Sequence, residues 1–281
     1  MRRFGGKILV IKYGGSVMVE ERLKELVATD IVLLRHIGIS PVIVHGGGSE
    51  VSRWMKKVGK EAVFIDGLRF TDHETMEITE MVLSGKISNE IVTLINQKGG
   101  RALGLSGKDA HLFTAKKIRS TADDDLGLVG EIDKTDVSLL LSLCEKGYIP
   151  VISSIGVDSS GKSLNLNADH VAAALARALN ALKLIYLTDV EGVILDGQTL
   201  SILDVRQVKE LLKNPQIKGG MLPKLRYAIE ALEGSVTSVH IINGSVDHSL
   251  LLEIFTEAGV GTKIDKVIRE TSDVEQCGVS S

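Results

Sequence analysis

The sequence is poor in the residues that build metal centres, disulfide frameworks and membrane spans. It has two cysteines in 281 residues. Cys144 and Cys277 lie far apart and form neither a disulfide framework nor a zinc site. The seven histidines show no H-E-x-x-H spacing, so we expect no metal held by the protein. No apolar run approaches the roughly 18 residues of a membrane helix, and none near the start resembles a signal peptide. We therefore expect a cytoplasmic protein.

An excess of charge of one sign is also missing. The 33 lysines and arginines against 36 aspartates and glutamates leave a net charge of −3, which gives no electrostatic case for binding nucleic acid or an anionic membrane. The chain is long enough for one large or two modest domains. Glycine, in contrast, is plentiful, with 29 residues, and many of them follow strand-like runs directly.

Strand-like and helix-like segments alternate along the chain. Residues 7–15, "KILVIKYGG", predict a strand that ends in a glycine turn, and residues 20–38 predict an amphipathic helix that ends at a glycine. The pattern repeats at "SPVIVHGGG" and continues through residues 137–259. Such alternation is typical of an α/β protein with a mainly parallel sheet. In such sheets ligands bind beyond the carboxyl ends of the strands, where these glycines lie.

One stretch imitates a phosphate-binding loop. "GVDSSGKS", Gly156–Ser163, satisfies G-x-x-x-x-G-K-[ST], and a later apolar run ends in Asp189. A working loop needs a helix that starts at the Gly-Lys-Ser itself. Here "LNLNAD" follows, which reads as extended, and helical periodicity begins only at Ala168. We interpret the match as accidental, and "VDSSGK" as a surface turn marked by Asp158 and Gly161.

Two earlier glycine turns make a better anion site. Gly14 and Gly15 follow the strand that holds Lys12, and Gly46 to Gly48 follow "PVIVH". Such turns let backbone amides approach anionic oxygens closely, although each turn alone is explained equally well as a tight connection. Lys12 lies inside an apolar run, where an unpaired ammonium is costly. Together these features predict an anion-binding floor.

Several sequence motifs occur along the chain in the same order as in a known protein family. "IKYGGS", "VHGGG", "DGLRFTD", "VLSGKISNEIV", "LNLNAD", "LIYLTDVEGVI" and "GGMLPK" resemble the acetylglutamate kinases of the amino acid kinase superfamily, from about Lys7 to Ile264. The resemblance implies a three-layer αβα sandwich around a mainly parallel sheet. It also implies an amino-acid-binding and dimerisation lobe at 1–179 and a nucleotide-binding lobe at 180–281. The implied activity, in arginine biosynthesis, transfers the ATP γ-phosphoryl group to the side-chain carboxylate of N-acetyl-L-glutamate, giving N-acetylglutamyl phosphate.

The resemblance assigns three catalytic residues. Lys12 and Lys224 would contact the transferring phosphoryl group from two sides, and Asp169 would hold the lysines in place. Asp169 also reads as the N-cap of the helix that follows it. A carboxylate nucleophile is already ionised near neutral pH and needs no general base. The reaction does need converging anions neutralised and the acceptor oxygen aligned with phosphorus.

Five residues would bind the amino-acid substrate by the same resemblance. The amides of Gly46 and Gly47 and the guanidinium of Arg69, a fork for the α-carboxylate, act with Asn165 and Asn167. Two alternatives stay open from the residues alone. Arg69 also reads as a surface arginine, and the asparagines also read as turn or strand-edge residues.

The nucleotide site would combine the first glycine turn with the segment "TDVEGVI". The residues that the resemblance implies are Gly14, Gly15, Thr188, Asp189, Val190, Gly192, Val193 and Ile194. The nucleotide would be ATP with Mg²⁺. The ion would be held mainly by ATP oxygens and waters, so no residue is expected as a metal ligand.

Two other functions remain open. A close relative phosphorylates aminoadipate or glutamate carried on a small acidic protein and needs a basic rim for that carrier, which this chain does not clearly show. A non-catalytic arginine or nucleotide sensor is the second alternative, and the presence of both Lys12 and Lys224 counts against it.

Assembly and regulation give conflicting signals. Arginine-inhibited members of the family carry an extra amino-terminal helix that joins three dimers, whereas "MRRFGG" is too short and glycine-rich for that helix. Yet residues 248–262 resemble the carboxyl-terminal half of the arginine site. Either this half-site lost its partner or the start codon was placed too far downstream. We expect a homodimer that is insensitive to arginine, with a nitrogen-regulatory protein as a further candidate partner.

Overall fold

The computed structural model describes residues 5–65, 67–118, 125–256 and 259–267. Cys277, most of "MRRFGG" and residues 257–258 of the expected half-site lie outside these ranges.

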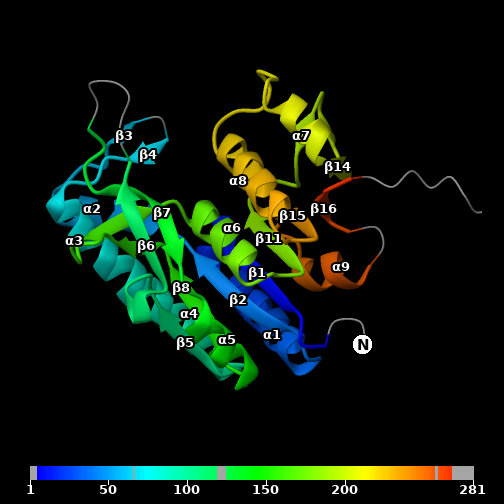
Figure 1. Ribbon diagram of the computed structural model, residues 1–281, viewed down its shortest axis with the longest axis horizontal. Coiled ribbons are helices and arrows are strands. Elements are labelled where there is room, and N and C mark those ends of the chain that lie inside the picture. Colours follow the sequence, from blue (N-terminus) through cyan, green and yellow to red (C-terminus); the bar gives the residue numbers. More distant parts are fainter. Residues whose placement is uncertain (1–4, 66, 119–124, 257–258, 268–281) are drawn as a thin grey trace, which may run out of the picture.

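At the centre is an eight-stranded sheet in the order β14-β16-β15-β11-β1-β2-β8-β5 (Figure 1). Its strands are β1 (Ile8–Tyr13), β2 (Ser40–His45), β5 (Ala102–Leu105), β8 (Ile149–Ser153), β11 (Lys183–Thr188), β14 (Ile202–Asp204), β15 (Ser238–Asn243) and β16 (Gly261–Asp265). Within the described chain, the pairing of β15 with β16 is antiparallel and the others in this sheet are parallel. The mainly parallel sheet is confirmed.

Helices cover both faces of the sheet because successive strand residues point to opposite sides. In β1, Val10 joins one buried core, whereas Leu9 and Ile11 join the other. The first core includes α5 (Ser138–Glu145), α6 (Ala168–Ala178), α7 (Val205–Leu211) and α8 (Met221–Glu233). The second includes α1 (Glu21–His36), α2 (Gly48–Lys57), α3 (His73–Glu80), the π-helix η2 (Met81–Ile87), α4 (Ser88–Gln97) and α9 (Ser249–Phe255). The three-layer sandwich is therefore confirmed. No helix in the described ranges has the length and apolar character to cross a membrane.

The sheet runs through both expected lobes. β1 pairs with β2 on one side and with β11 on the other. In Figure 1 the elements that follow β11, such as α7, α8 and β16, lie at the right. The division into lobes at residues 179 and 180 stays a prediction.

A small closed barrel, in the order β10-β7-β6-β9, contains the stretch that imitates a phosphate loop. Its strands are β6 (Phe113–Lys117), β7 (Val129–Thr135), β9 (Ile155–Val157) and β10 (Ser163–Leu166). β9 and β10 form an antiparallel pair, and Asp158 closes the turn between them by accepting the backbone N–H groups of Ser160 at 2.8 Å and Lys162 at 2.9 Å. Lys162 is followed by a strand, and the next helix begins at Ala168. The interpretation as a surface turn is confirmed.

Candidate active site

The three expected catalytic residues lie together near the carboxyl end of β1. Lys12 is the fifth residue of β1 and lies beside Tyr186 of β11. Its Nζ is 3.0 Å from Oδ1 of Asp169, in the first turn of α6. Nζ of Lys224, from α8, is 2.9 Å from Oδ2 of the same carboxylate. The structure thus brings two ammonium groups to either side of one carboxylate.

The Asp169 carboxylate is ionised in spite of its burial. Only 8% of its side chain is exposed. Burial alone would raise its pKa, but Lys12 and Lys224 more than offset that effect, and the pKa lies below its usual value. One carboxylate and two ammonium groups leave one positive charge in excess. Such an excess suits a site where anionic groups converge.

The reading of Asp169 as a helix N-cap is wrong. The cap of α6 is Asn167, whose side-chain oxygen accepts the backbone N–H groups of Asp169 at 2.8 Å and His170 at 3.4 Å. An N-cap side chain must turn back to its own helix. The Asp169 side chain instead points to the two lysines.

A cavity of about 260 Å³ opens beside this cluster. Lys12 and Asp169 lie in its wall, together with all five expected substrate residues. Those five are Gly46, Gly47, Arg69, Asn165 and Asn167. They come from the turn after β2, from β4 (Leu68–Arg69) in the short β3–β4 hairpin, and from β10 with the turn that follows it. The sequence placed these residues at one site, and the structure brings them together. Their role as ligands stays a prediction.

Arg69 is buried, so its reading as a surface arginine is wrong. Its Nη2 donates to the carbonyl of Gly48 at 2.7 Å and to Oγ of Ser52 at 2.9 Å, and its guanidinium lies 4.7 Å from the ring centre of Phe64, in β3 (Phe64–Ile65). Burial lowers its pKa. Within the described residues no carboxylate forms an ion pair with Arg69. A guanidinium held this way in a cavity wall is suited to bind an incoming carboxylate.

The two glycine turns are places where a side chain would not fit. Gly47 has φ of +154°, and a Cβ there would lie 2.1 Å from Cδ1 of Ile87. Gly15 has φ of +75°, and a Cβ there would lie 2.3 Å from Oδ1 of Asp189. Both turns therefore require glycine. The nearness of Asp189 to Gly15 also shows that the turn after β1 lies beside the expected nucleotide segment.

The nucleotide segment, residues 188–194, follows β11 and is fixed by local hydrogen bonds. Val190 N–H donates to Oγ1 of Thr188 at 3.0 Å, and Val193 N–H donates to Oγ1 of Thr262, at the start of β16, at 2.8 Å. The side chains of Val190 and Ile194 are exposed, whereas Val193 is fully buried. The Val193 carbonyl also accepts the backbone N–H of Leu200 at 2.9 Å, so this residue is held on both sides by the protein itself. Nucleotide binding by this segment stays a prediction.

Sequence reasoning missed Tyr186 and His45. Tyr186 is fully buried, and its hydroxyl donates to the backbone carbonyl of Asp169 at 3.2 Å, which links β11 to the start of α6. His45 ends β2 directly before Gly46 and is also fully buried. The signal that could have found them is a hydrogen-bonding side chain inside an apolar strand, because such a group needs a partner.

His45 makes the free energy of unfolding depend on pH. Nδ1 lies 3.0 Å from the Gly46 carbonyl oxygen and donates to it, while Nε2 is buried without a partner. Burial lowers the pKa to about 4 from 6.5. Between those two pH values the unfolded chain binds a proton that the folded chain excludes. As the pH falls from 6.5 to about 4, this residue therefore lowers the free energy of unfolding by about 1.4 kcal/mol per pH unit. We expect urea unfolding of a His45→Asn variant to lose that part of the pH slope. Equal slopes in both chains would contradict this assignment.

Comparisons with known proteins identify the family of the chain. The sequence profile of the amino acid kinase family matches residues 7–243, and the chain belongs to that family. An acetylglutamate kinase from Syntrophobacter fumaroxidans is 51% identical over 97% of this chain and 95% of its own length. Another from Kosmotoga olearia is 51% identical over 94% and 93%. Within the family, the chain belongs to the acetylglutamate kinases.

Solved structures share the fold. An N-acetylglutamate synthase from Neisseria gonorrhoeae, complexed with coenzyme A and N-acetyl-glutamate, has a TM-score of 0.85 and 29% identity. The match covers 95% of this chain but only 61% of the synthase chain. A carbamate kinase from Giardia lamblia bound to AMP-PNP has a TM-score of 0.66 and 17% identity over 92% of this chain and 98% of its own, so it supports the fold alone.

Proposed function

We propose that Lys12, Lys224 and Asp169 carry out the transfer of the ATP γ-phosphoryl group to the side-chain carboxylate of N-acetyl-L-glutamate. As an acetylglutamate kinase, the chain is a phosphotransferase with a carboxyl group as acceptor, and the reaction belongs to arginine biosynthesis. The observation that carries the residue assignment is the carboxylate held between two lysines at the wall of the cavity that contains Arg69.

Each side chain has a separate task in this proposal. Arg69 and the amides of Gly46 and Gly47 hold the acceptor, with its free carboxylate directed toward Lys12. The acceptor carboxylate attacks phosphorus directly, and its charge at neutral pH removes the need for a base. Lys12 and Lys224 offset the charge on the transferring oxygens, and Asp169 keeps the two ammonium groups apart and directed. No group in this account has to move a proton.

ATP would bind with Mg²⁺, and the donor set fits an ion held by the nucleotide. In the part of the chain that the structure describes, no group of three or more His, Cys, Asp or Glu side chains could hold a metal. Asp169 is engaged by two lysines. Mg²⁺ usually keeps several waters and binds through phosphate oxygens, and when bound it neutralises phosphate charge. The expected homodimer stays a prediction that light scattering tests.

The assay that tests this function is hydroxamate formation from acetylglutamate, hydroxylamine and MgATP. We expect hydroxamate that requires both substrates, because hydroxylamine traps the acyl phosphate. Product only from aminoadipate or glutamate on a carrier protein would instead favour the alternative kinase. Absence of product from every acceptor, with nucleotide still bound, would favour a sensor.

A further inference from the structure

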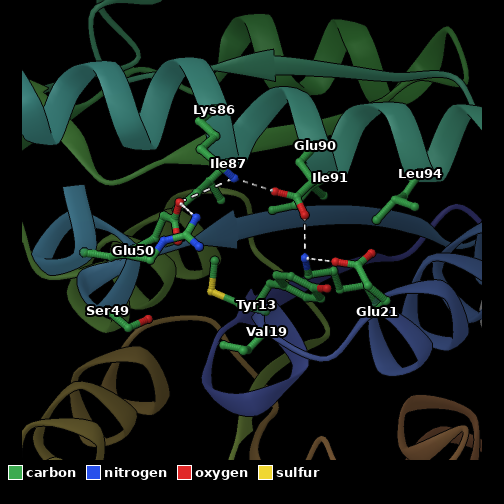
Figure 2. Close-up of a pocket in the computed structure, with 14 residues that line it drawn as sticks. Tyr13, Val19, Glu21, Ser49, Glu50, Lys86, Ile87, Glu90, Ile91 and Leu94 are labelled. Atoms are coloured by element: carbon green, nitrogen blue, oxygen red, sulfur yellow. Dashed lines mark hydrogen bonds and ion pairs between the residues drawn. The ribbon is translucent and has the colours of Figure 1, made fainter. Parts of the chain in front are cut away.

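A second cavity, of about 220 Å³, lies on the other side of the substrate turn. Gly47 lies in the wall of both cavities. The remaining wall comes from the end of β1 and the segment after it, from the first turns of α1 and α2, and from η2 and α4 (Figure 2). The cavity opens between these elements, although buried side chains of α1, α2, η2 and α4 also pack together in the second core.

In addition to this packing, a network of ion pairs crosses the cavity. Its members alternate in charge from α2 through η2 and α4 to α1: Arg53, Glu50, Lys86, Glu90, Lys24 and Glu21. Figure 2 shows the pairs as dashed lines between the helices. Nζ of Lys86 lies 3.4 Å from Glu50 and 3.3 Å from Glu90, and Nζ of Lys24 lies 2.8 Å from Glu21 and contacts Glu90 more closely still.

Lys24 is the most buried of the six residues in this ion-pair network. Its side chain is 9% exposed, whereas that of Lys86 is 40% exposed. Burial would lower the pKa of Lys24, but hydrogen bonds to Glu21 and Glu90 offset this and raise it. Its ammonium group thus stays charged and joins α1 to α4 across a distance of 66 residues in sequence.

The two helices α1 and α2, which are joined in this way, each follow one of the glycine turns. α1 begins three residues after η1 (Gly15–Met18), which is itself held by the Tyr13 hydroxyl donating to the carbonyl of Val17 at 3.0 Å. α2 begins directly after Gly47. Lys24 ties the first helix, and Glu50 ties the second, to Glu90 and Lys86. These two are one turn apart and pair with each other. The helical run from η2 to α4 is therefore linked by ion pairs to both helices that follow the turns.

We infer that Lys24 is a positioning residue, which sets the nucleotide turn at Gly14 and Gly15 relative to the substrate turn at Gly46 and Gly47 through Glu90. The inference rests on the proposed binding of the two substrates at these turns. Partly exposed ion pairs contribute little to stability. A misplacement of about 1 Å between reacting groups, however, can cost roughly 100-fold in rate. The effect of Lys24 is therefore expected in turnover more than in folding.

The test compares a Lys24→Met variant with the wild-type chain. We expect kcat to fall about 10-fold, while the dissociation constants of acetylglutamate and of ATP, each measured alone by calorimetry, stay within about twofold. Each substrate alone touches one turn, so it does not sense the spacing between the turns. A Lys24→Arg variant keeps the cation and should recover most of the turnover. An unchanged kcat in Lys24→Met, or a loss of binding as large as the loss of turnover, would overturn the inference.

Lys98→Met is the matched control. Nζ of Lys98 lies 3.3 Å from Glu25 of α1, so this pair also joins α1 to the α4 end, but away from the cavity. We expect its turnover to equal that of the wild-type chain, and an equal loss in both variants would overturn a specific role for Lys24. Failure of the proposed function would appear differently, as a wild-type chain that does not phosphorylate acetylglutamate.

Discussion

The Lys224→Ala variant is expected to turn over about 10² to 10³-fold more slowly than the wild-type chain, the scale for one preorganised charge-stabilising group. Lys224 contacts the Asp169 carboxylate at 2.9 Å from α8 and, unlike Lys12, does not line the cavity that contains Arg69. Its loss should lower kcat in the hydroxamate assay while the KM for acetylglutamate changes little. A comparable rise in that KM would instead place Lys224 in the acceptor site.

Lys162→Ala is the control for this result. Lys162 lies on the exposed turn between β9 and β10, so we expect its removal to leave turnover unchanged. An inactive Lys162 variant beside an active Lys224 variant would reverse the assignment and restore the phosphate-loop reading of "GVDSSGKS".

The Arg69→Lys variant is expected to raise the KM for acetylglutamate about 10- to 100-fold and to leave the KM for ATP nearly unchanged. Lysine keeps the charge but loses the planar fork that binds a carboxylate with two parallel hydrogen bonds. The expected factor corresponds to one lost hydrogen bond to a charged group, about 1.5–3 kcal/mol. Steady-state kinetics with each substrate varied in turn measures both constants.

Arg101→Lys is a matched control for that substitution. The Arg101 guanidinium also stacks on an aromatic ring, 4.2 Å from the centre of Tyr148, but it is exposed and does not line the cavity. We expect neither KM to change. Equal KM changes for both substrates in Arg69→Lys would show that Arg69 lies outside the acceptor site.

The sequence predicted those parts of the site that local pattern determines. The helix expected at 20–38 is α1, Glu21–His36. Helical periodicity that starts at Ala168 correctly separated an accidental motif from a phosphate loop. Glycines after strands marked both turns, because a position without room for a Cβ shows in the residue type.

Features that depend on distant partners could not be predicted from the sequence. The burial of Arg69 depends on Ser52 and Phe64 closing around it. The ion pair between Lys24 and Glu90 joins residues that no local periodicity connects. The cap of α6, in contrast, follows from local pattern, because a helix that begins at Ala168 takes its N-cap from the residue before it, Asn167.

The place of β1 in the middle of the sheet has a consequence for how the chain folds. β1 begins at Ile8, yet one of its two partners, β11, begins at Lys183. Closing a loop of that length is entropically costly, and contacts so distant in sequence slow folding. During synthesis β1 must also wait for β11, with the backbone N–H and C=O groups of that edge unpaired, which is a hazard for aggregation. Residues 1–179 made alone would keep that edge permanently open.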